Sequence, residues 1–407
     1  MGKQSQQTNE VHDKRWAIVS MASIPLIMTL GNSMLIPVLP MMEQELDISK
    51  LQSSYIISVY SIVGIFLIPI AGFLSDRYGR KNIIIPSLII TAIGALIAGW
   101  ASWKMQDAFL FIIIGRILQG IGASGAAPIV MPLVGDMFRS DKDISSTLGI
   151  IETSNTFGKV LSPVLGAVLA GMIWFLPFFS IPVFCLLSIL LIFFLVKKPK
   201  EEQEGPSFTE FKENTKEVFK KHKRWLMAIF IIGAILMFIL FGVLFYLSSM
   251  LEEVYNFKGI TKGLYLAVPL AALCLASFIT GKKIEDNLVM MKWITFGGIV
   301  LAGSSIVAIR FSEQFVYLIV VFLFCGIGIG AVLPCLDSLI TESIQKEIRG
   351  TITSIYSSAR FVGVAGGPPA VALLMKQDLT WLVSLLGFLA LIAAYLAFKN
   401  IKPEAKR

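Results

Sequence analysis

The feature of this sequence that most limits its fold is a succession of long apolar runs. A membrane-spanning helix needs about 20 mostly apolar residues, and we find twelve such runs among the 407 residues. Hydrophobic residues make up 56% of the chain and charged residues only 15%, whereas a soluble domain carries roughly 25% charged residues. The sequence therefore excludes a soluble enzyme, a coiled coil, a disordered chain and a disulfide scaffold. It predicts an all-α integral membrane protein with twelve transmembrane helices.

The runs fall into two sets of six, separated by one long polar segment. The first set lies near 16–41, 51–74, 83–102, 107–130, 145–170 and 173–196. The second set lies near 225–250, 261–281, 289–310, 314–337, 350–373 and 380–399. We therefore expect an N-terminal six-helix bundle over 1–196, a partly helical cytoplasmic linker over 197–224 and a C-terminal six-helix bundle over 225–407.

The positive charges predict how the chain lies in the membrane. If the N-terminus is inside, 26 of the 35 Lys and Arg residues lie on the cytoplasmic side and six outside, Lys262 among the six. Cytoplasmic loops of membrane proteins carry such an excess of Lys and Arg. We expect a multi-pass protein of the bacterial cytoplasmic membrane with both termini in the cytoplasm. The same bias explains the net charge of +8 without nucleic-acid binding.

A weak internal repeat relates the two sets of runs. Gly120-Ile-Gly122 leads to Pro128, and the same pattern recurs at Gly326-Ile-Gly328 and Pro334, 206 residues later. Gly158 stands five residues before Pro163, as Gly363 does before Pro368. Such repeats are typical of transporters that bind substrate near the membrane midplane between two related halves.

The sequence lacks the clustered Cys and His residues that metal binding and nucleophilic catalysis usually need. The four Cys residues lie inside apolar runs without a Cys-x-x-Cys spacing, and the two His residues lie in charged segments outside the runs. Zinc sites and catalytic triads need clustered Cys, His or Asp side chains. We therefore expect no metal, no cofactor and no enzymatic activity. A proton carried within the membrane must then use a carboxylate.

A few charged residues lie deep within the runs. Glu152 is the deepest carboxylate, and Lys159 follows it seven residues later on the same face of the predicted helix. Asp337 is the second carboxylate, and Arg360 is a cation in the eleventh run. Ionisable residues inside membranes are costly and tend to be functional. We predict that Glu152 and Asp337 take part in proton transfer and that Lys159 and Arg360 face the substrate.

Two alternatives to these roles stay open. Glu152 and Lys159 can instead form a structural ion-pair network with Arg116, and Arg360 can pair with Asp337. Uncharged residues of the runs complete the predicted substrate cavity, namely Asn32, Tyr60 and Tyr246.

The turn after the second run has the sequence Gly-Phe-Leu-Ser-Asp-Arg-Tyr-Gly-Arg-Lys over 72–81. An Asp in such a turn can cap a helix and pair with a basic side chain, which makes a latch that forms and breaks. Here the chain resembles the major facilitator superfamily, whose signature loop these residues match. We expect the latch to comprise Gly72, Asp76, Arg77, Gly79 and Arg80, and to hold the cytoplasmic side closed. The counterpart around Gly281 is degenerate.

Two further motifs carry the resemblance. The fourth run contains Arg116-Ile-Leu-Gln119-Gly120-Ile-Gly122, which is similar to a superfamily motif associated with proton coupling. The alternative is a structural Arg bonded to backbone carbonyls. The fifth run contains Gly158, Ser162, Pro163 and Gly166, which resemble the superfamily's antiporter motif, although Ser162 and Ala167 stand where that motif has Gly.

The stretches around Asp337 and Arg360, and the Gly-Gly-Pro-Pro of 366–369, resemble twelve-helix drug:proton pumps of Gram-positive bacteria. The resemblance implies two pseudo-symmetric six-helix bundles. It also implies a monomeric secondary transporter that exports small amphipathic molecules in exchange for protons by alternating access.

Two rival functions remain. The first is a dedicated exporter of an endogenous anionic product such as a metallophore or siderophore, with a lipid or glycolipid flippase as a variant. Three cations within the runs favour it: Arg116, Lys159 and Arg360. The second is an uptake facilitator or symporter, which the motif in the fifth run disfavours.

Overall fold

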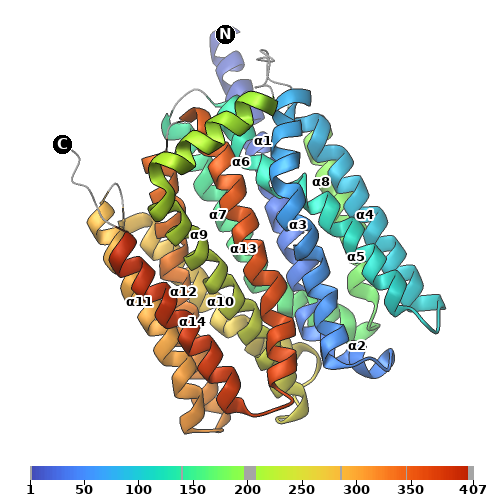
Figure 1. Cartoon of the computed structure of the whole chain (residues 1–407). Coiled ribbons are helices and arrows are strands. Elements are labelled where there is room, and N and C mark those ends of the chain that lie inside the picture. The colour runs from blue at the N-terminus through green and yellow to red at the C-terminus, as the bar shows by residue number, and fades with distance from the viewer. Residues whose placement is uncertain (1, 139–140, 197–207, 285–286, 345, 402–407) are drawn as a thin grey trace.

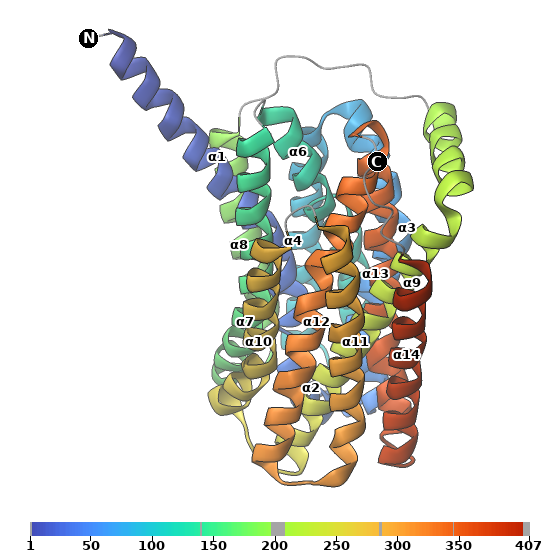
Figure 2. The ribbon, with the colours of Figure 1, turned by 90° about the vertical axis from the view of Figure 1, so that its left-hand side faces the viewer.

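A computed structural model describes residues 2–138, 141–196, 208–284, 287–344 and 346–401. Its described elements are all helices, and most of them run side by side along one long axis (Figures 1 and 2). The first half contains α1 (Gly2–Ser33), η1 (Ile36–Val38), α2 (Leu39–Glu45), α3 (Lys50–Tyr78), α4 (Arg80–Lys104), α5 (Phe109–Ser124), η2 (Ala127–Ile129), α6 (Val130–Met137), α7 (Asp141–Met172) and α8 (Leu176–Leu195). The second half contains α9 (Phe208–Glu253), α10 (Gly259–Lys283), α11 (Leu288–Ala308), η3 (Ile309–Phe311), α12 (Phe315–Ser343), α13 (Lys346–Leu374) and α14 (Leu379–Asn400).

The twelve predicted runs correspond to twelve helical rods, because α1–η1–α2 and α5–η2–α6 each form one broken rod. Within the described residues, ten rods are long and apolar enough to cross a membrane. The other two, α7 and α13, have 32 and 29 residues and are as long as their neighbours. They are also the rods that carry Glu152, Lys159 and Arg360. The two least apolar rods are therefore the two that hold most of the predicted site.

Prolines account for the breaks in the first and fourth rods. Pro37 lies in η1 and Pro128 in η2. A proline inside a helix removes one backbone donor and clashes with the preceding turn. Other helices tolerate an internal proline without a break, including α7 at Pro163 and α12 at Pro334. The predicted start of the second bundle, residue 225, falls inside α9, which begins at Phe208.

Helix packing repeats between the two halves. In the first half α1 packs on α7, α3 on α5 and α4 on α8; in the second half α9 packs on α13, α10 on α12 and α11 on α14. Each pair has its counterpart at the corresponding place in the order of spans. This correspondence supports the duplication that the sequence indicates.

The repeated glycines are the points of closest approach in these pairs. A Cβ atom on Gly120 would lie 2.6 Å from the Tyr60 carbonyl oxygen of α3, and one on Gly326 would meet the Pro269 carbonyl of α10. Glycine at these positions lets helix backbones approach closely. The first repeated motif therefore serves helix packing in both halves.

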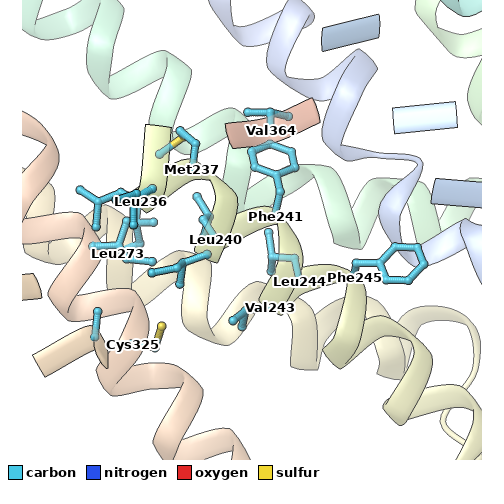
Figure 3. Packing of buried hydrophobic residues seen from close by; sticks show 14 of the residues in the cluster. Leu236, Met237, Leu240, Phe241, Val243, Leu244, Phe245, Leu273, Cys325 and Val364 are labelled. Atoms are coloured by element: carbon cyan, nitrogen blue, oxygen red, sulfur yellow. The ribbon is translucent and has the colours of Figure 1, made fainter. Parts of the chain in front are cut away.

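The most extensive contacts between the halves are made by two helix pairs, α3 with α13 and α7 with α10. Helix α9 carries much of the second half's core. Figure 3 shows its Leu236, Leu240 and Leu244 in one cluster that also contains Leu273 and Cys325. An apolar window of α9 is 83% buried, as is one in the first rod. The helices with polar residues thus lie at the contact between two apolar bundles.

Candidate functional site between the two halves

Four charged side chains from both halves form one cluster. Glu152 and Lys159 come from α7, Asp337 from α12 and Arg360 from α13. Lys159 lies within electrostatic range of the other three, although they belong to two different bundles. The Nη1 atom of Arg360 lies 3.7 Å from Oδ1 of Asp337. The pairing that the sequence left open for Arg360 is therefore formed.

This cluster is not sealed inside the packed core. The Asp337 side chain is 39% exposed and that of Arg360 20%, although both lie within long membrane-type helices. Glu152 and Lys159 are half-buried, and within the described part of the chain no direct ion pair joins them. Charges at membrane depth normally face a partner or a water-filled cavity. Two cations and two carboxylates give a site that can meet both anionic and hydrogen-bond-donating groups of a ligand.

Glu152 is held by a chain of polar contacts that the sequence analysis missed. Asn155, one turn further along α7, donates from Nδ2 to Oε1 of Glu152 at 3.3 Å. Its Oδ1 atom accepts a hydrogen bond of 2.5 Å from the Thr29 hydroxyl of α1. The predicted proton carrier is thus connected to a second helix of its own half. The spacing of three residues between Glu152 and Asn155 places them on one helix face, and this spacing could have indicated their contact.

The motif around Pro163 has a local explanation for its unusual serine. Pro163 has no N–H to give to the carbonyl of Lys159, four residues earlier. The Ser162 hydroxyl donates to that carbonyl at 3.0 Å. A Gly at this position, as in the motif that the segment resembles, has no such donor. Ser162 therefore satisfies the backbone of the residue that carries a cluster cation.

The same segment of α7 is clamped between two helices. Gly158 faces the Leu26 carbonyl of α1, and Gly166 faces the carbonyl of Met34, the residue after the end of α1. On the other side, a Cβ atom on Gly263 of α10 would lie 2.6 Å from the Pro163 carbonyl oxygen. The motif therefore lies where the second half contacts the first.

Arg116 lies in a separate site inside the first half. It is fully buried and donates to the Ile56 carbonyl at 2.7 Å, the Gln119 amide oxygen at 2.7 Å and the Asn32 amide oxygen at 2.6 Å. Its guanidinium carbon lies 4.6 Å from the centre of the Tyr60 ring. These partners are uncharged and include a backbone carbonyl, as in the structural alternative for Arg116. The geometry brings Arg116 to α1 and α3 rather than to the charge cluster.

The five residues predicted to line a substrate cavity occupy three different places. Lys159 and Arg360 join the cluster, whereas Asn32 and Tyr60 surround Arg116. Tyr60 also stacks on Phe361 of the second half, with ring centres 6.4 Å apart. Tyr246 packs edge-on against Phe322 within the second half.

The residues of the predicted latch lie at one end of the first half. Arg80 pairs with Asp76, and its Nε atom lies 3.0 Å from Oδ2 of Asp136 at the end of α6. Gly79 joins α3 to α4 with φ +89°, a left-handed conformation that favours glycine. Arg77 points outward and stacks on Tyr78, so Arg80 is the ionic partner of Asp76. Gly72 approaches the second half: a Cβ there would lie 3.3 Å from the Ser354 hydroxyl of α13.

At the opposite end, polar contacts join the two halves directly. The Nζ atom of Lys50 in α3 lies 2.6 Å from Oε2 of Glu253 in α9. The Nζ atom of Lys262 in α10 donates to the Pro37 carbonyl of η1 at 2.7 Å. Lys262 also pairs with Glu252 at 2.7 Å and is 2% exposed. The distribution of Lys and Arg placed Lys262 on the outer side, and the structure buries it in the first turn of α10. Polar contacts therefore join the two halves at this end.

Comparison with known proteins shows the family of this chain and proteins of similar sequence. The model of the Major Facilitator Superfamily matches residues 21–368 and 292–407. The Bacillibactin exporter of Bacillus subtilis (strain 168) is 51% identical over 392 residues, which cover 96% of this chain and 97% of that protein. Multidrug resistance protein 2 of the same organism is 24% identical over 394 residues, covering 94% of each chain.

Solved structures share the fold at low sequence identity. A bacterial homologue of the human lysosomal transporter Spinster, in an inward-facing and unoccupied conformation, superimposes with a TM-score of 0.78 at 16% identity, covering 96% of this chain and 97% of that one. The D-xylose-proton symporter superimposes with a TM-score of 0.76 at 14% identity, covering 96% and 98%. The predicted fold of two six-helix bundles is confirmed.

Proposed function

Because the chain belongs to the major facilitator superfamily, we propose that it exports a metal-free siderophore from the cytoplasm in exchange for protons. It is a multi-pass membrane protein and a secondary transporter of that family. In our proposal both termini lie in the cytoplasm, as the distribution of Lys and Arg favours. The latch of Asp76 and Arg80 then lies on the cytoplasmic side, and the end where Lys50 and Lys262 join the halves is the outer end.

The observation that carries the proposal is the pair of cations contributed by opposite halves. Lys159 and Arg360 lie in one cluster at the meeting of the bundles. Siderophores bind iron through oxygen atoms, which suit hard metal ions and carry negative charge when ionised. A ligand held by a cation from each half links its own binding to the movement of one bundle against the other.

The relatives favour this substrate class over a broad range of drugs. The relative at 51% identity is named as an exporter of bacillibactin, whereas the multidrug resistance proteins are only about half as similar in sequence. The expectation of a dedicated exporter of an anionic product is therefore better supported than general export of amphipathic molecules.

The carboxylates of the cluster provide a route to proton exchange. A metal-free chelator keeps protons on some of the oxygens that would bind iron, and ionised carboxylates can accept hydrogen bonds from those groups. Protonation of Glu152 or Asp337 removes the negative charge and turns one carboxylate oxygen into a donor, which weakens that acceptor. Substrate and protons then compete for one site, which is the condition for exchange. The segment around Pro163 resembles the antiporter motif, which also supports exchange of substrate for protons.

Transport into everted membrane vesicles tests the proposal. Vesicles containing the protein should accumulate metal-free bacillibactin when their interior is acidic, and much less when the pH gradient is collapsed. A lipophilic cation such as ethidium serves as the comparison substrate. Accumulation of ethidium without bacillibactin would support a drug exporter and refute the proposal. Accumulation of bacillibactin that ignores the pH gradient would refute the proton exchange alone.

A further inference from the structure

The first rod is broken at the outer end, where it meets the second half. α1 ends at Ser33, η1 covers Ile36–Val38 and α2 begins at Leu39. Pro37 and Pro40 lie in this break. In a continuous α-helix the Ile36 carbonyl would accept from the N–H of the residue four positions later, which is Pro40 and has none. The Ile36 carbonyl accepts instead from the Leu39 N–H through the 3-10 turn, and it keeps a lone pair for a second donor. Backbone acceptors of the break are therefore open to further donors at the contact between the halves.

Two side chains of the second half fill these acceptors. The Ser248 hydroxyl of α9 donates to the Ile36 carbonyl at 2.9 Å, and Nζ of Lys262 of α10 donates to the Pro37 carbonyl at 2.7 Å. Both donors are almost completely buried. Hydrogen bonds shielded from water are stronger than exposed ones, and they leave a costly unsatisfied group when broken.

The charge of Lys262 is balanced inside its own half. Its Nζ atom lies 2.7 Å from Oε2 of Glu252, which comes from α9. A buried charge without a partner is strongly unfavourable. Because both members of the pair belong to the second half, they can move together when the halves separate. Among the described residues, the hydrogen bond of Lys262 that must then break is the one to the Pro37 carbonyl.

We infer that Ser248 and Lys262 are the locking residues of the outer gate, and that the Ile36 and Pro37 carbonyls are the groups they lock onto. The break in the first rod thus provides the surface against which the second half docks. This inference rests on the proposed alternating access but not on the identity of the substrate. It can therefore be tested by measuring the shape of the protein without any ligand.

An exposed ion pair at the same interface provides a matched control. Lys50 of α3 pairs with Glu253 of α9, but these side chains are 26% and 41% exposed. Solvent-exposed ion pairs contribute little to stability, because water screens them and the side chains lose entropy. If the buried hydrogen bonds to the Ile36 and Pro37 carbonyls hold the outer end closed, and charge pairing in general does not, Lys50 should be dispensable for closure.

Distance measurements between spin labels test the inference directly. Labels are placed at Gln106 and Gln377, exposed residues of the outer end in the first and second half, in a protein whose four native cysteines are replaced. Lys262→Met should raise the ratio of open to closed outer ends by about tenfold, because one buried charged hydrogen bond is lost. Ser248→Ala should raise it by a smaller factor, and Lys50→Met should leave it unchanged.

Two further variants keep the test decisive. Lys262→Met with Glu252→Gln removes both charges, so opening cannot be attributed to an unpaired buried Glu252. Pro40→Ala restores an N–H that competes with Ser248 for the Ile36 carbonyl, and should also favour the open form. Unchanged distances in Pro40→Ala and Ser248→Ala, or an equal response to Lys50→Met, would overturn the inference. Failure of bacillibactin transport with these distance shifts intact would refute only the proposed function.

Discussion

Arg360 of α13 faces Asp337 of α12 with its Nη1 atom 3.7 Å from the carboxylate oxygen Oδ1. Tight charge-assisted N–H···O hydrogen bonds measure about 2.7–2.9 Å, so this pair is loose, and both side chains remain partly exposed. Arg360 is therefore paired but still able to take a second anion. In the proposed cycle a substrate oxygen and Asp337 share this cation, while Lys159 approaches from the other half.

Glu152→Gln should abolish transport driven by a pH gradient while retaining downhill exchange of substrate. The variant keeps the shape of the side chain and an oxygen acceptor for Asn155, which donates to Glu152 in the native protein, but it cannot carry a proton. Everted vesicles preloaded with substrate measure both modes. If the variant still pumps against a gradient, Glu152 is not the carrier and Asp337 becomes the leading candidate. If it does not fold, its role is structural.

Ser162 and Pro163 should show strong coupling in a double-mutant cycle. Ser162→Ala leaves the Lys159 carbonyl without its side-chain donor, which should cost about 1 kcal/mol of stability. Pro163→Ala restores the backbone N–H, so adding Ser162→Ala to it should cost almost nothing. Thermal unfolding in detergent measures the cycle. Additive effects of the two substitutions would contradict the backbone explanation.

Pro163→Ala should also weaken coupling between transport and the proton gradient more than it lowers expression. The Pro163 carbonyl is the contact point of Gly263 across the halves, so a change of helix geometry there alters the interface itself. The ratio of gradient-driven to downhill transport is the readout. Intact coupling in this variant would remove the main support for exchange with protons.

Arg116→Lys should lower stability more than it alters coupling. The guanidinium serves several acceptors from one planar group, including the Ile56 carbonyl and the Asn32 side chain, which a lysine ammonium cannot reproduce. We expect a loss of about 2–3 kcal/mol, given the strength of hydrogen bonds to charged groups. A variant with native stability but uncoupled transport would instead assign Arg116 to proton coupling.

Asp76→Asn should shift the protein toward forms that are open on the cytoplasmic side. The substitution removes the charge that pairs with Arg80, while Asp136 keeps Arg80 anchored to α6, so the fold should survive. Labelling of single cysteines introduced at the cytoplasmic end of α13 reports the shift. Arg77→Gln is the control, since Arg77 stacks on Tyr78 and should have little effect. Equal labelling of Asp76→Asn and the native protein would refute a role in closure.

The fold could be predicted because its determinants are local. A run of apolar residues specifies a span wherever it lies, and the glycine repeats mark helix contacts in both halves. The seven-residue spacing of Glu152 and Lys159 likewise places them on one helix face. Their meeting with Asp337 and Arg360 depends on how two bundles dock, which no local pattern encodes.

The surroundings of two buried cations, Arg116 and Lys262, could not be predicted from the sequence because of the kind of partners they have. Arg116 bonds largely to backbone carbonyls and amide oxygens, which leave no charged signature in the sequence. Lys262 stands at the start of a run, where the sequence predicts only that it lies on the outer side. Its burial depends on Glu252, ten residues earlier, and on the Pro37 carbonyl, 225 residues away.

The most direct test of the central claim is the affinity of the purified protein for metal-free bacillibactin in Lys159→Met and Arg360→Met. Lys376→Met, an exposed lysine at the outer end, is the control. If a cation from each half binds the siderophore, each cluster variant should lose about tenfold or more in affinity, the equivalent of about 1.4 kcal/mol, and the control should match the native protein. Native affinity in both cluster variants would contradict the account.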